Sequence, residues 1–446
     1  MISSDLLEIV RPLAVHFRTS GFQLFLVGGI VRDEQLRAGS WVDIDLATDA
    51  LPADTKRIVA PFASAVWTQG ERFGTIGCRI DAHEFEITTF RGDEYEPESR
   101  KPMVAFTPSI DRDLARRDFT INAMAVDAET GELHDPFGGR HDLEMRVLRT
   151  PLGADASFSD DPLRMLRAAR FHARFDLALA PDIEDAIDRQ RHRLTIVSAE
   201  RVRGELHKLF AGPDASRGLA FLVAHRLLDR WIPELVGLRA VHDPAHGGLD
   251  ALAHTFAVID ALTPDPLLRM TALLHDLAKV DGLDDHATRG ATLAVQRLRG
   301  LRHAEHDVRD ASRIIEHHHR IHAHVGDWSA ADVRRVIVDC GSTLDRLVEL
   351  SGANAAARRG DLAAKCRAQV EAFVRVRAVL GDEHDDLGPE LDGRQIMDAL
   401  DVGPGRAVGE AQAFLQELRL RDGSVGEARA TQALLEWWRA RQELTR

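Results

Sequence analysis

The sequence predicts an α+β fold in which a small mixed sheet is followed by a long helical region. Short β-type runs separated by glycine-rich or polar turns occur between about residues 22 and 150, and the clearest are 74–80 and 84–90. From Pro151 onward nearly every segment has helical periodicity. The 446 residues are enough for about three domains of the usual size. We expect an N-terminal domain over 1–150, followed by helical segments over 151–240, 241–365 and 366–446.

The composition limits the classes of protein to which the chain can belong. Its 44% hydrophobic and 29% charged residues are typical of a soluble globular protein, and no run of about 18 apolar residues could span a bilayer. The N-terminus lacks the features of a secretory signal, so we expect a cytoplasmic protein with no membrane partner. A net charge of −14 argues against a protein that coats nucleic acid indiscriminately. The three isolated cysteines, Cys78, Cys340 and Cys366, are expected to be buried.

Two carboxylates in the N-terminal domain form a candidate metal site. Asp43 and Asp45 are two residues apart in a β-type run, so both side chains point to the same face of the strand. Carboxylate oxygens suit Mg²⁺, which in nucleotide enzymes commonly lies between one or two carboxylates and the substrate phosphates. We therefore expect Asp43 and Asp45 to bind two Mg²⁺ ions. The same spacing also occurs at solvated strand edges and turns, so the assignment depends on the residues upstream.

A double glycine precedes these aspartates. Gly28 and Gly29 close the apolar run 24–27, and their backbone can pass close to a triphosphate at the start of a helix expected near Val31. Arg32 lies in the first turn of that helix and is placed to bind phosphate oxygens. Together with the two carboxylates, this pattern predicts a metal-dependent phosphoryl-transfer site.

A second polar group lies at the start of the helical region. A proline at 162 favours a helix start there, with Asp160 or Asp161 as N-cap. Asp161 and Arg164 are three residues apart, so we expect them on one helix face. An acceptor beside a donor fits cytosine and adenine, which present an amino donor next to a ring-nitrogen acceptor, and it repels uracil and guanine. The alternative is a capping acid that forms an i,i+3 ion pair with the arginine.

Histidines in the 241–365 segment form a second candidate metal site. His275 and Asp276 are adjacent and follow apolar helical residues, while His254, His286 and the run 317–319 lie in neighbouring helical segments. Imidazole and carboxylate groups are ligands for divalent metals. We expect His254, His275 and Asp276 to bind a second divalent metal. The run 317–319 is equally consistent with helix-surface residues near RNA.

The order of these motifs resembles that of the class II tRNA nucleotidyltransferases, a family that includes CCA-adding enzymes and bacterial poly(A) polymerases. The matching segments are Gly28-Gly29-Ile30-Val31-Arg32-Asp33 with Asp43-Ile44-Asp45, then 116–125, 135–143, Asp160-Asp161-Pro162-Leu163-Arg164 and 200–206. The resemblance implies a polymerase-beta-like nucleotidyltransferase head, an all-α neck, an HD-type body at about 240–365 and a helical tail. One departure is Asp160, where the family usually has Glu.

The resemblance also implies a function and roles for individual residues. The expected reaction is template-independent transfer of CMP and AMP from CTP and ATP to the tRNA 3′ end with release of pyrophosphate, without a protein partner. In the two-metal mechanism Asp43 and Asp45 hold the cations. The expected nucleotide-binding residues are Gly28, Gly29, Arg32, Arg117, Asp161, Arg164, Arg167 and Arg170. For each of these arginines the alternative is an ordinary surface ion pair.

Three alternatives remain open at the level of the sequence. The segment 91–102 has the composition of a mobile loop, although a charged surface loop would have the same composition. In the resembled family such a loop accompanies the switch from C to A addition, so we favour full CCA addition over CC-only addition, while A-only addition stays open. Poly(A) polymerases of the family usually carry basic extensions, which this acidic chain lacks. The third alternative is an HD-type metal-dependent phosphohydrolase. It is weakened by Asn354, which stands where the HD pattern usually has an Asp.

Overall fold

The computed structural model describes residues 3–36, 43–92, 105–381 and 387–444. The chain consists of two compact units, Met1–Arg230 and Trp231–Arg446. Residues 93–102 of the expected mobile loop 91–102 lie outside the described residues. Within the described ranges, no helix is both long and apolar enough to cross a membrane.

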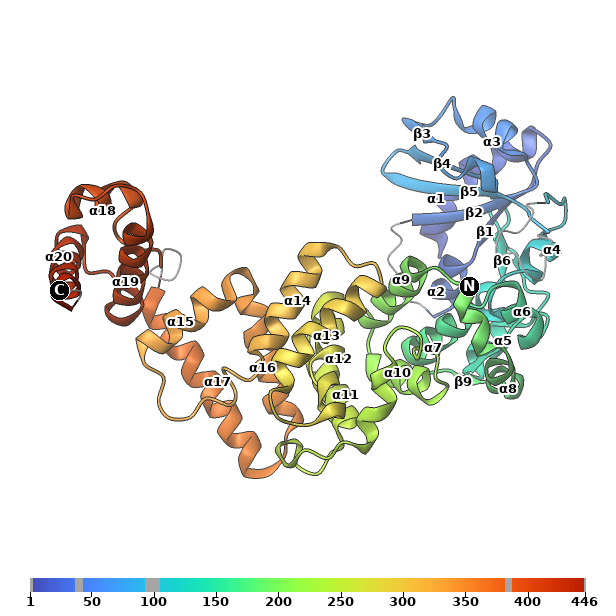
Figure 1. The fold of residues 1–446 in the computed structure, drawn as a ribbon. Helices are drawn as coiled ribbons and strands as arrows, with labels where there is room; N and C mark the ends of the chain where they lie inside the picture. The colour runs from blue at the N-terminus through green and yellow to red at the C-terminus, as the bar shows by residue number, and fades with distance from the viewer. Residues whose placement is uncertain (1–2, 37–42, 93–104, 382–386, 445–446) are drawn as a thin grey trace. The chain divides into compact units, whose positions relative to one another are not determined.

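A mixed sheet forms the N-terminal part of unit 1 (Figure 1). In sheet order its described strands are β3 (Ala65–Trp67), β4 (Thr75–Ile80), β5 (His83–Thr89), β2 (Asp43–Thr48), β1 (Leu24–Val27), β6 (Ala125–Asp127) and β7 (Leu133–His134). β2 and β5 run parallel, whereas the other neighbouring strands are antiparallel. The prediction of a small mixed sheet in an α+β protein is therefore confirmed.

Alternation along the central strands separates the core from the solvent-facing side. In β2, Ile44 and Leu46 are buried while Asp45 between them is exposed, and in β5 Phe85 and Ile87 flank the exposed Glu86 in the same way. This is the pattern expected where one face of a sheet covers a core. Helices α1 (Ser4–Thr19) and α3 (Pro52–Val59) contact the sheet, and α2 (Gly29–Gln35) lies between β1 and β2 in the chain.

A short helical segment links the sheet to the helices of unit 1. α4 (Ile110–Ala115) and the 3₁₀ turn η2 (Thr120–Asn122) precede β6, and α5 (Gly139–Glu144) packs against η2. β8 (Val147–Leu148) then pairs in parallel with β9 (Ala178–Leu179). The remaining helices of the unit are α6 (Ala154–Asp160), α7 (Arg164–Phe175), α8 (Pro181–Gln190), α9 (Ala199–Phe210) and α10 (Ala215–Ala224).

The regular secondary structure described in unit 2 is helical, apart from an isolated bridge between His242 and Asp250. It contains the 3₁₀ turns η4 (Pro233–Ala240), η5 (Pro244–His246), η6 (Leu277–Asp281) and η7 (Gly341–Thr343), and the helices α11 (Ala251–Ala261), α12 (Pro266–Leu274), α13 (His286–Gly300), α14 (Glu305–His317), α15 (Ala330–Cys340), α16 (Leu344–Ala357) and α17 (Gly360–Leu380). α11, α12, α14 and α16 pack on one another, and α13 pairs with α14. The helical prediction for this half of the chain is confirmed.

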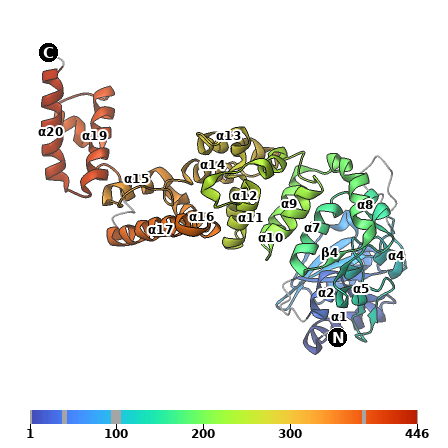
Figure 2. The same cartoon turned by 90° about the horizontal axis from the view of Figure 1, so that it is seen from below.

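The last three helices share a core of their own. α18 (Gly393–Leu400), α19 (Arg406–Asp422) and α20 (Glu427–Leu444) bury leucine and isoleucine side chains against one another, and α19 and α20 lie side by side in both views (Figure 1 and Figure 2). Trp437 stacks on Phe414 with a centroid separation of 5.0 Å. The three cysteines are buried and unpaired, as expected.

We predict opposite stability effects for two glycine-to-alanine substitutions in unit 1. In Gly139→Ala the new Cβ would lie 2.1 Å from the carbonyl oxygen of Thr120, so the linking segment must shift, at a cost of about 1–3 kcal/mol of unfolding free energy. In Gly204→Ala, inside α9, the new Cβ would meet no atom within 4 Å beyond its chain neighbours and the nearby backbone of its own helix, so helix propensity should add about 0.5–1 kcal/mol. Urea unfolding measures both. Equal midpoints for the two variants would contradict the close contact at Gly139.

Candidate active site

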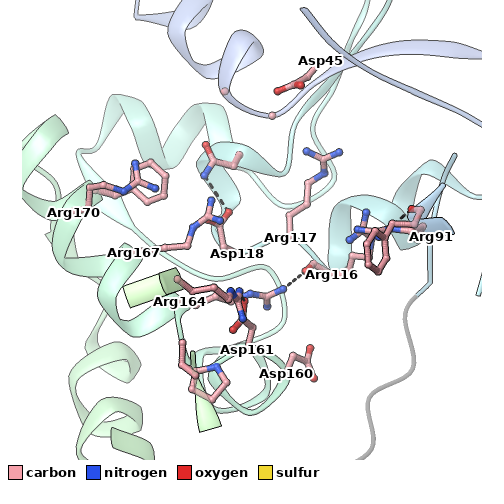
Figure 3. A pocket seen from close by; sticks show the side chains of 18 of the residues that line it. Asp45, Arg91, Arg116, Arg117, Asp118, Asp160, Asp161, Arg164, Arg167 and Arg170 are labelled. Carbon is pink, nitrogen blue, oxygen red and sulfur yellow. Dashed lines mark hydrogen bonds and ion pairs between the residues drawn. The ribbon is translucent and has the colours of Figure 1, made fainter. Parts of the chain in front are cut away.

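A single cavity of about 900 Å³ in unit 1 brings together most of the predicted site residues (Figure 3). Its lining carries eight arginines and only four aspartates, so the cavity attracts anions. The arginines are Arg32, Arg91, Arg116, Arg117, Arg164, Arg167, Arg170 and Arg201, and the aspartates are Asp45, Asp118, Asp160 and Asp161.

One of the two strand carboxylates, Asp45, lies at the sheet side of this cavity. Asp45 lines it, and Asp43 lies two residues earlier in β2, with its side chain outside the described residues. Glu86 is the register partner of Asp45 on the parallel strand β5 and is also exposed, so it presents a further carboxylate on the same face. Sequence reasoning missed Glu86 because the pairing of β2 with β5 is a tertiary feature.

The double glycine approaches the arginines closely. Gly28 is the N-cap of α2 with φ of 74°, a conformation that side chains disfavour, and a Cβ on it would lie 3.1 Å from Nη1 of Arg117. Gly29 begins α2, two residues earlier than expected, so Arg32 is the fourth residue of this short helix and belongs to its last turn rather than to its first. In Figure 3 the Arg117 side chain extends toward Asp45.

Arg32 is buried and connected to the helical side of the cavity by a polar network. It donates to Oδ1 of Asn122 at 2.5 Å, and Asn122 donates to Oδ1 of Asp118 at 3.0 Å. Oδ2 of Asp118 lies 2.6 Å from Arg167 of α7. Burial alone would raise the pKa of Asp118, but Arg167, the Asn122 amide and Arg164 outweigh it and hold that pKa below its usual value.

A second buried carboxylate holds the neighbouring pair of arginines. Asp113 of α4 contacts Arg116 at 2.8 Å through Oδ1 and Arg117 at 3.0 Å through Oδ2. Its side chain is 1% exposed. Burial favours the neutral acid, yet Arg117 and Arg116 hold the pKa of Asp113 below its usual value. Asp113 therefore stays ionised and fixes both guanidinium groups at the cavity wall.

The predicted helical pair of Asp161 and Arg164 is arranged differently from our expectation. α7 begins at Arg164 with Leu163 as N-cap, so the expectation of Asp160 or Asp161 as N-cap is wrong, and Asp161 does not share the helix with Arg164. Asp161 is extended (φ −144°, ψ 102°) because the following proline disfavours helical geometry at the residue before it.

Both side chains nevertheless line the cavity, each with other partners. Asp161 accepts from the Leu163 backbone N–H and lies 2.6 Å from Arg201 of α9. Arg164 donates to Oγ of Ser157 at 2.9 Å and to the carbonyl of Arg116. No ion pair between Asp161 and Arg164 is found among the described contacts, so the i,i+3 alternative is not the arrangement seen.

The last two predicted arginines have carboxylate partners as well. Arg167 pairs with Asp118, and the buried Arg170 lies 2.7 Å from Glu205 of α9. Both also line the cavity, and in Figure 3 they approach it from α7 together with Arg164. They are thus ion-paired cavity residues rather than solvated surface pairs.

Sequence reasoning did not single out Asp113, Asp118, Asn122 or Arg201. Asp113 was accessible from sequence, because an acid three and four residues before two arginines is placed to pair with both in a helix. Arg201 lies 40 residues from Asp161, and no local pattern joins them.

The predicted metal ligands of unit 2 lie in one buried cluster. His246, His254 and Asp276 have ligand atoms within 4.8 Å of one another, and the same is true of His275, Asp276 and His318. The amide oxygen of Asn354 lies 3.1 Å from Nε2 of His254. The sequence did not single out His246. His318 is fully buried, so it is not a helix-surface residue.

The comparisons with known proteins identify the family of the chain. Residues 24–149 match the family described as the Poly A polymerase head domain, and 176–238 match the probable RNA and SrmB-binding site of polymerase A. An A-adding tRNA nucleotidyltransferase of Deinococcus radiodurans is 32% identical over 438 residues, which cover 93% of this chain and 95% of the relative.

The chain belongs to the class II family of CCA-adding enzymes and poly(A) polymerases. A CCA-adding enzyme of Geobacillus stearothermophilus is 40% identical over 235 residues, and this match covers 52% of the chain and 55% of the relative. The chain thus spans about half the length of the curated CCA-adding enzymes it matches. A crystal structure of the Bacillus stearothermophilus CCA-adding enzyme in complex with CTP has a TM-score of 0.74 at 27% identity and covers 99% of this chain and 100% of its own.

We predict that Asp118→Asn weakens the fold in a pH-dependent way. The pKa of Asp118 is lowered on folding, so its ionised form contributes stability that is present above the unfolded pKa of about 3.9 and is lost as pH falls through the lower folded pKa. The substitution should cost roughly 1–3 kcal/mol of unfolding free energy at neutral pH, and the difference from wild type should shrink below about pH 4. Thermal unfolding between pH 3 and pH 7 measures this.

The matched control is Asp155→Asn, which removes an aspartate of the exposed ion pair with Arg189 in the same unit. A much smaller change is expected there, because exposed pairs contribute little. Equal losses in the two variants at neutral pH would contradict the role given to the buried carboxylate.

Proposed function

We propose that the protein is a CCA-adding tRNA nucleotidyltransferase, which transfers CMP and AMP from CTP and ATP to the tRNA 3′ end. The observation that carries the proposal is the sharing of one arginine-lined cavity by Asp45, at the sheet side, and by Asp161 and Arg164, at the helical side. A bound nucleoside triphosphate requires both sides of the cavity. Its phosphates require cations, and its base requires an oriented donor and acceptor. A cytoplasmic location, where tRNA is found, is part of the proposal.

The family implies catalysis with a divalent cation, and the residues present fit such an ion. Asp45 and Asp43 on one strand, with Glu86 beside them, offer the hard oxygen ligands that Mg²⁺ prefers. Two Mg²⁺ ions held there would lower the pKa of the RNA 3′-hydroxyl and neutralise the leaving pyrophosphate.

The arginines account for triphosphate binding. Arg32 and Arg117 lie beside Gly28 and Gly29, where the absence of side chains lets phosphate oxygens approach the backbone. Asp113 and the network around Asp118 hold the guanidinium groups in place before substrate arrives. Such preorganisation avoids the cost of ordering flexible cations during the reaction.

The helical wall accounts for base selection. Each oxygen of Asp161 already accepts one hydrogen bond, from Leu163 N–H or from Arg201, and a carboxylate oxygen can accept a second. Asp161 can therefore take the amino group of cytosine or adenine, while Arg164 donates to the ring nitrogen. Arg201 then acts as a positioning residue that holds the acceptor.

One observation favours a second candidate within the family. By sequence, a relative that matches nearly the whole chain is named an A-adding enzyme, whereas the sequence match to a CCA-adding relative covers about half of the chain. A-only addition is therefore the main competitor, and poly(A) addition and an HD-type phosphohydrolase are weaker ones.

The first test incubates the purified protein and Mg²⁺ with tRNA transcripts ending before CCA, after C and after CC. CTP, ATP, UTP and GTP are supplied singly and in pairs, and the products are resolved on sequencing gels. Stepwise CCA addition followed by a stop is expected. Addition only to the transcript ending in CC would identify an A-adding enzyme, and long A tails would identify a poly(A) polymerase.

We predict that Asp45→Asn lowers incorporation by at least about 100-fold, because metal stabilisation of the transition state is worth several kcal/mol. Asp54→Asn, which changes a partly exposed aspartate on α3, is the control and should retain activity. Activity that survives Asp45→Asn but is lost in His275→Ala would move the chemistry to unit 2.

We predict graded losses of base selection in variants of the helical wall. Asp161→Ala should reduce the preference for CTP over UTP by roughly 5- to 100-fold, because it removes one hydrogen-bond partner in a closed site. Arg201→Ala should reduce the preference less, since the acceptor remains but loses its support. Single-nucleotide incorporation rates measure both, and Arg189→Ala is the matched control from an exposed pair. Unchanged selectivity in Asp161→Ala would rule out Asp161 as the acceptor that selects the base.

A further inference from the structure

A row of register partners crosses the sheet of unit 1 from the candidate metal site to the edge strand. Asp45 of β2 pairs with Glu86 of β5. Glu86 also pairs with Gly77 of β4, and Gly77 pairs with Trp67 of β3, which lies at the end of the sheet order. Register partners point to the same face of a sheet, whereas their neighbours along each strand, such as the buried Phe85, point to the other. The indole of Trp67 therefore shares the face of the carboxylates, away from the core.

The indole fills the place of the side chain that Gly77 lacks. A Cβ on Gly77 would lie 1.8 Å from Nε1, 2.1 Å from Cε2 and 2.5 Å from Cδ1 of Trp67. The ring thus leans over β4 toward Glu86. Neighbouring strands lie about 4.8 Å apart, so the ring is close to Glu86 on the next strand and to Asp45 on the strand after it. Trp67 is only partly buried, so a surface of the ring stays open to a ligand.

The direction of phosphoryl transfer requires the RNA end to lie on this side of the carboxylates. The attacking and leaving oxygens in such a transfer are roughly in line. In the proposed function the pyrophosphate leaves beside Gly28 and Gly29, which follow β1, and β1 flanks β2 on the side away from β5. The RNA 3′-hydroxyl must then approach Asp45 from the side of β5 and β4. The nucleotide that carries this hydroxyl comes to lie over Glu86 and Gly77, next to the indole.

A cation flanks the indole on the same face. Arg79 lies two residues after Gly77 in β4, so its side chain points to the face that carries Trp67. Its side chain is 53% exposed and pairs with Glu84, which is 42% exposed. Exposed ion pairs contribute little to stability, so the guanidinium can turn to an RNA phosphate at small cost. A cation beside an aromatic ring is the combination by which proteins bind single-stranded nucleic acid.

We propose that Trp67 is the stacking surface for the base of the 3′-terminal nucleotide of the RNA, and that Arg79 binds a phosphate of the same unpaired strand. The inference rests on the function proposed above, which brings an RNA 3′ end to this face. Every base has a π-face, so stacking accepts any terminal base. A CCA-adding enzyme requires that tolerance, because the RNA end that it extends changes during the addition. Selection of the incoming base stays with Asp161 and Arg164.

The test combines a change in the protein with a change in the RNA. Dissociation constants are measured for the full-length protein and two tRNA transcripts that end after CC, one of which carries an abasic ribose as its last nucleotide. No nucleoside triphosphate is present, so the measurement does not depend on turnover. Removal of the base should weaken binding to the wild type by about 5- to 100-fold, the factor that one base–aromatic stack is worth.

In Trp67→Leu the complete transcript should bind as weakly as the abasic transcript binds to the wild type. Removal of the base should then have no further effect, because the surface on which it stacks is gone. An equal effect of base removal in the wild type and in Trp67→Leu would overturn the stacking assignment, and so would the absence of any effect in the wild type.

Further variants separate stacking from a structural role of the ring. Trp67→Phe keeps an aromatic face and should retain most of the difference between the two transcripts. Gly77→Ala leaves the indole in the chain but occupies its place, so it should lose the difference as Trp67→Leu does. Phe62→Leu is the matched control, because Phe62 is an exposed aromatic residue of unit 1 that stacks on His16, and it should bind as the wild type does. A lower melting temperature in Trp67→Leu with an unchanged difference between the transcripts would show that the ring only covers Gly77.

The salt dependence of binding tests the role of Arg79. Each phosphate that is neutralised in a single strand contributes about 0.7 to the slope of log K against log salt concentration. Arg79→Gln should therefore reduce the slope by about 0.7 and weaken the binding of both transcripts equally. Arg57→Gln, which removes the arginine of the exposed pair with Asp54 on α3, is the control and should leave the slope unchanged. An unchanged slope in Arg79→Gln would overturn the phosphate contact.

Nucleotide incorporation by the same proteins keeps this inference apart from the proposed function. A wild type that distinguishes the two transcripts in binding, through Trp67, but adds no nucleotide would support the stacking surface and contradict the proposed reaction. A wild type that adds C and A but binds both transcripts equally would overturn the role of Trp67 alone.

Discussion

The cavity of unit 1 depends on buried carboxylates that hold arginines together against their mutual repulsion. Two unit charges 4 Å apart interact with about 1 kcal/mol in water and about 4 kcal/mol at the effective dielectric constant of a protein surface. Eight arginines around one cavity would therefore drive its walls apart. Asp113, Asp118 and Glu205 each lie within a buried ion pair with one or two of these arginines. Their charges offset part of the repulsion and leave a net attraction for an anion.

These carboxylates also determine how sequence-distant parts of unit 1 meet. Asp118 joins Arg167 of α7 to Asn122 of η2, and Asn122 in turn accepts from Arg32 of α2. The polar contacts thus connect α2, beside the sheet, to α7, which carries Arg164, Arg167 and Arg170. A substitution in this network would disturb both ends of a bound nucleotide together, whereas the exposed pair of Asp155 and Arg189 joins no such elements.

Features encoded locally could be predicted from the sequence, and features created by packing could not. The strands β4 and β5, the helical half and the placement of Arg32 after Gly28 and Gly29 follow from periodicity and backbone freedom, and the structure contains all of them. The helix start expected at Pro162 was misplaced, because residues 162 and 163 form a turn and α7 begins at Arg164. Asp161 is extended, as an N-cap residue would be, so its conformation alone does not locate the helix start. The partnership of Asp161 with Arg201 and the pairing of Asp45 with Glu86 depend on tertiary contacts. No local sequence pattern indicates these tertiary contacts.

The two units solve one electrostatic problem in different ways. A buried carboxylate is stable only with a nearby positive charge or several donors. In unit 1 permanently charged guanidinium groups meet this need, and because they outnumber the carboxylates they leave the cavity ready for phosphates. In unit 2 the ammonium of Lys279 lies 2.9 Å from Oδ2 of Asp276 and 2.8 Å from Asp243, so one buried lysine serves both carboxylates. Nε2 of His246 and Nε2 of His275 lie 3.2 and 3.3 Å from the same Oδ2. Buried aspartates are therefore held among surplus arginines in unit 1, where the cavity attracts anions, and around a single lysine in unit 2, where no such surplus arises.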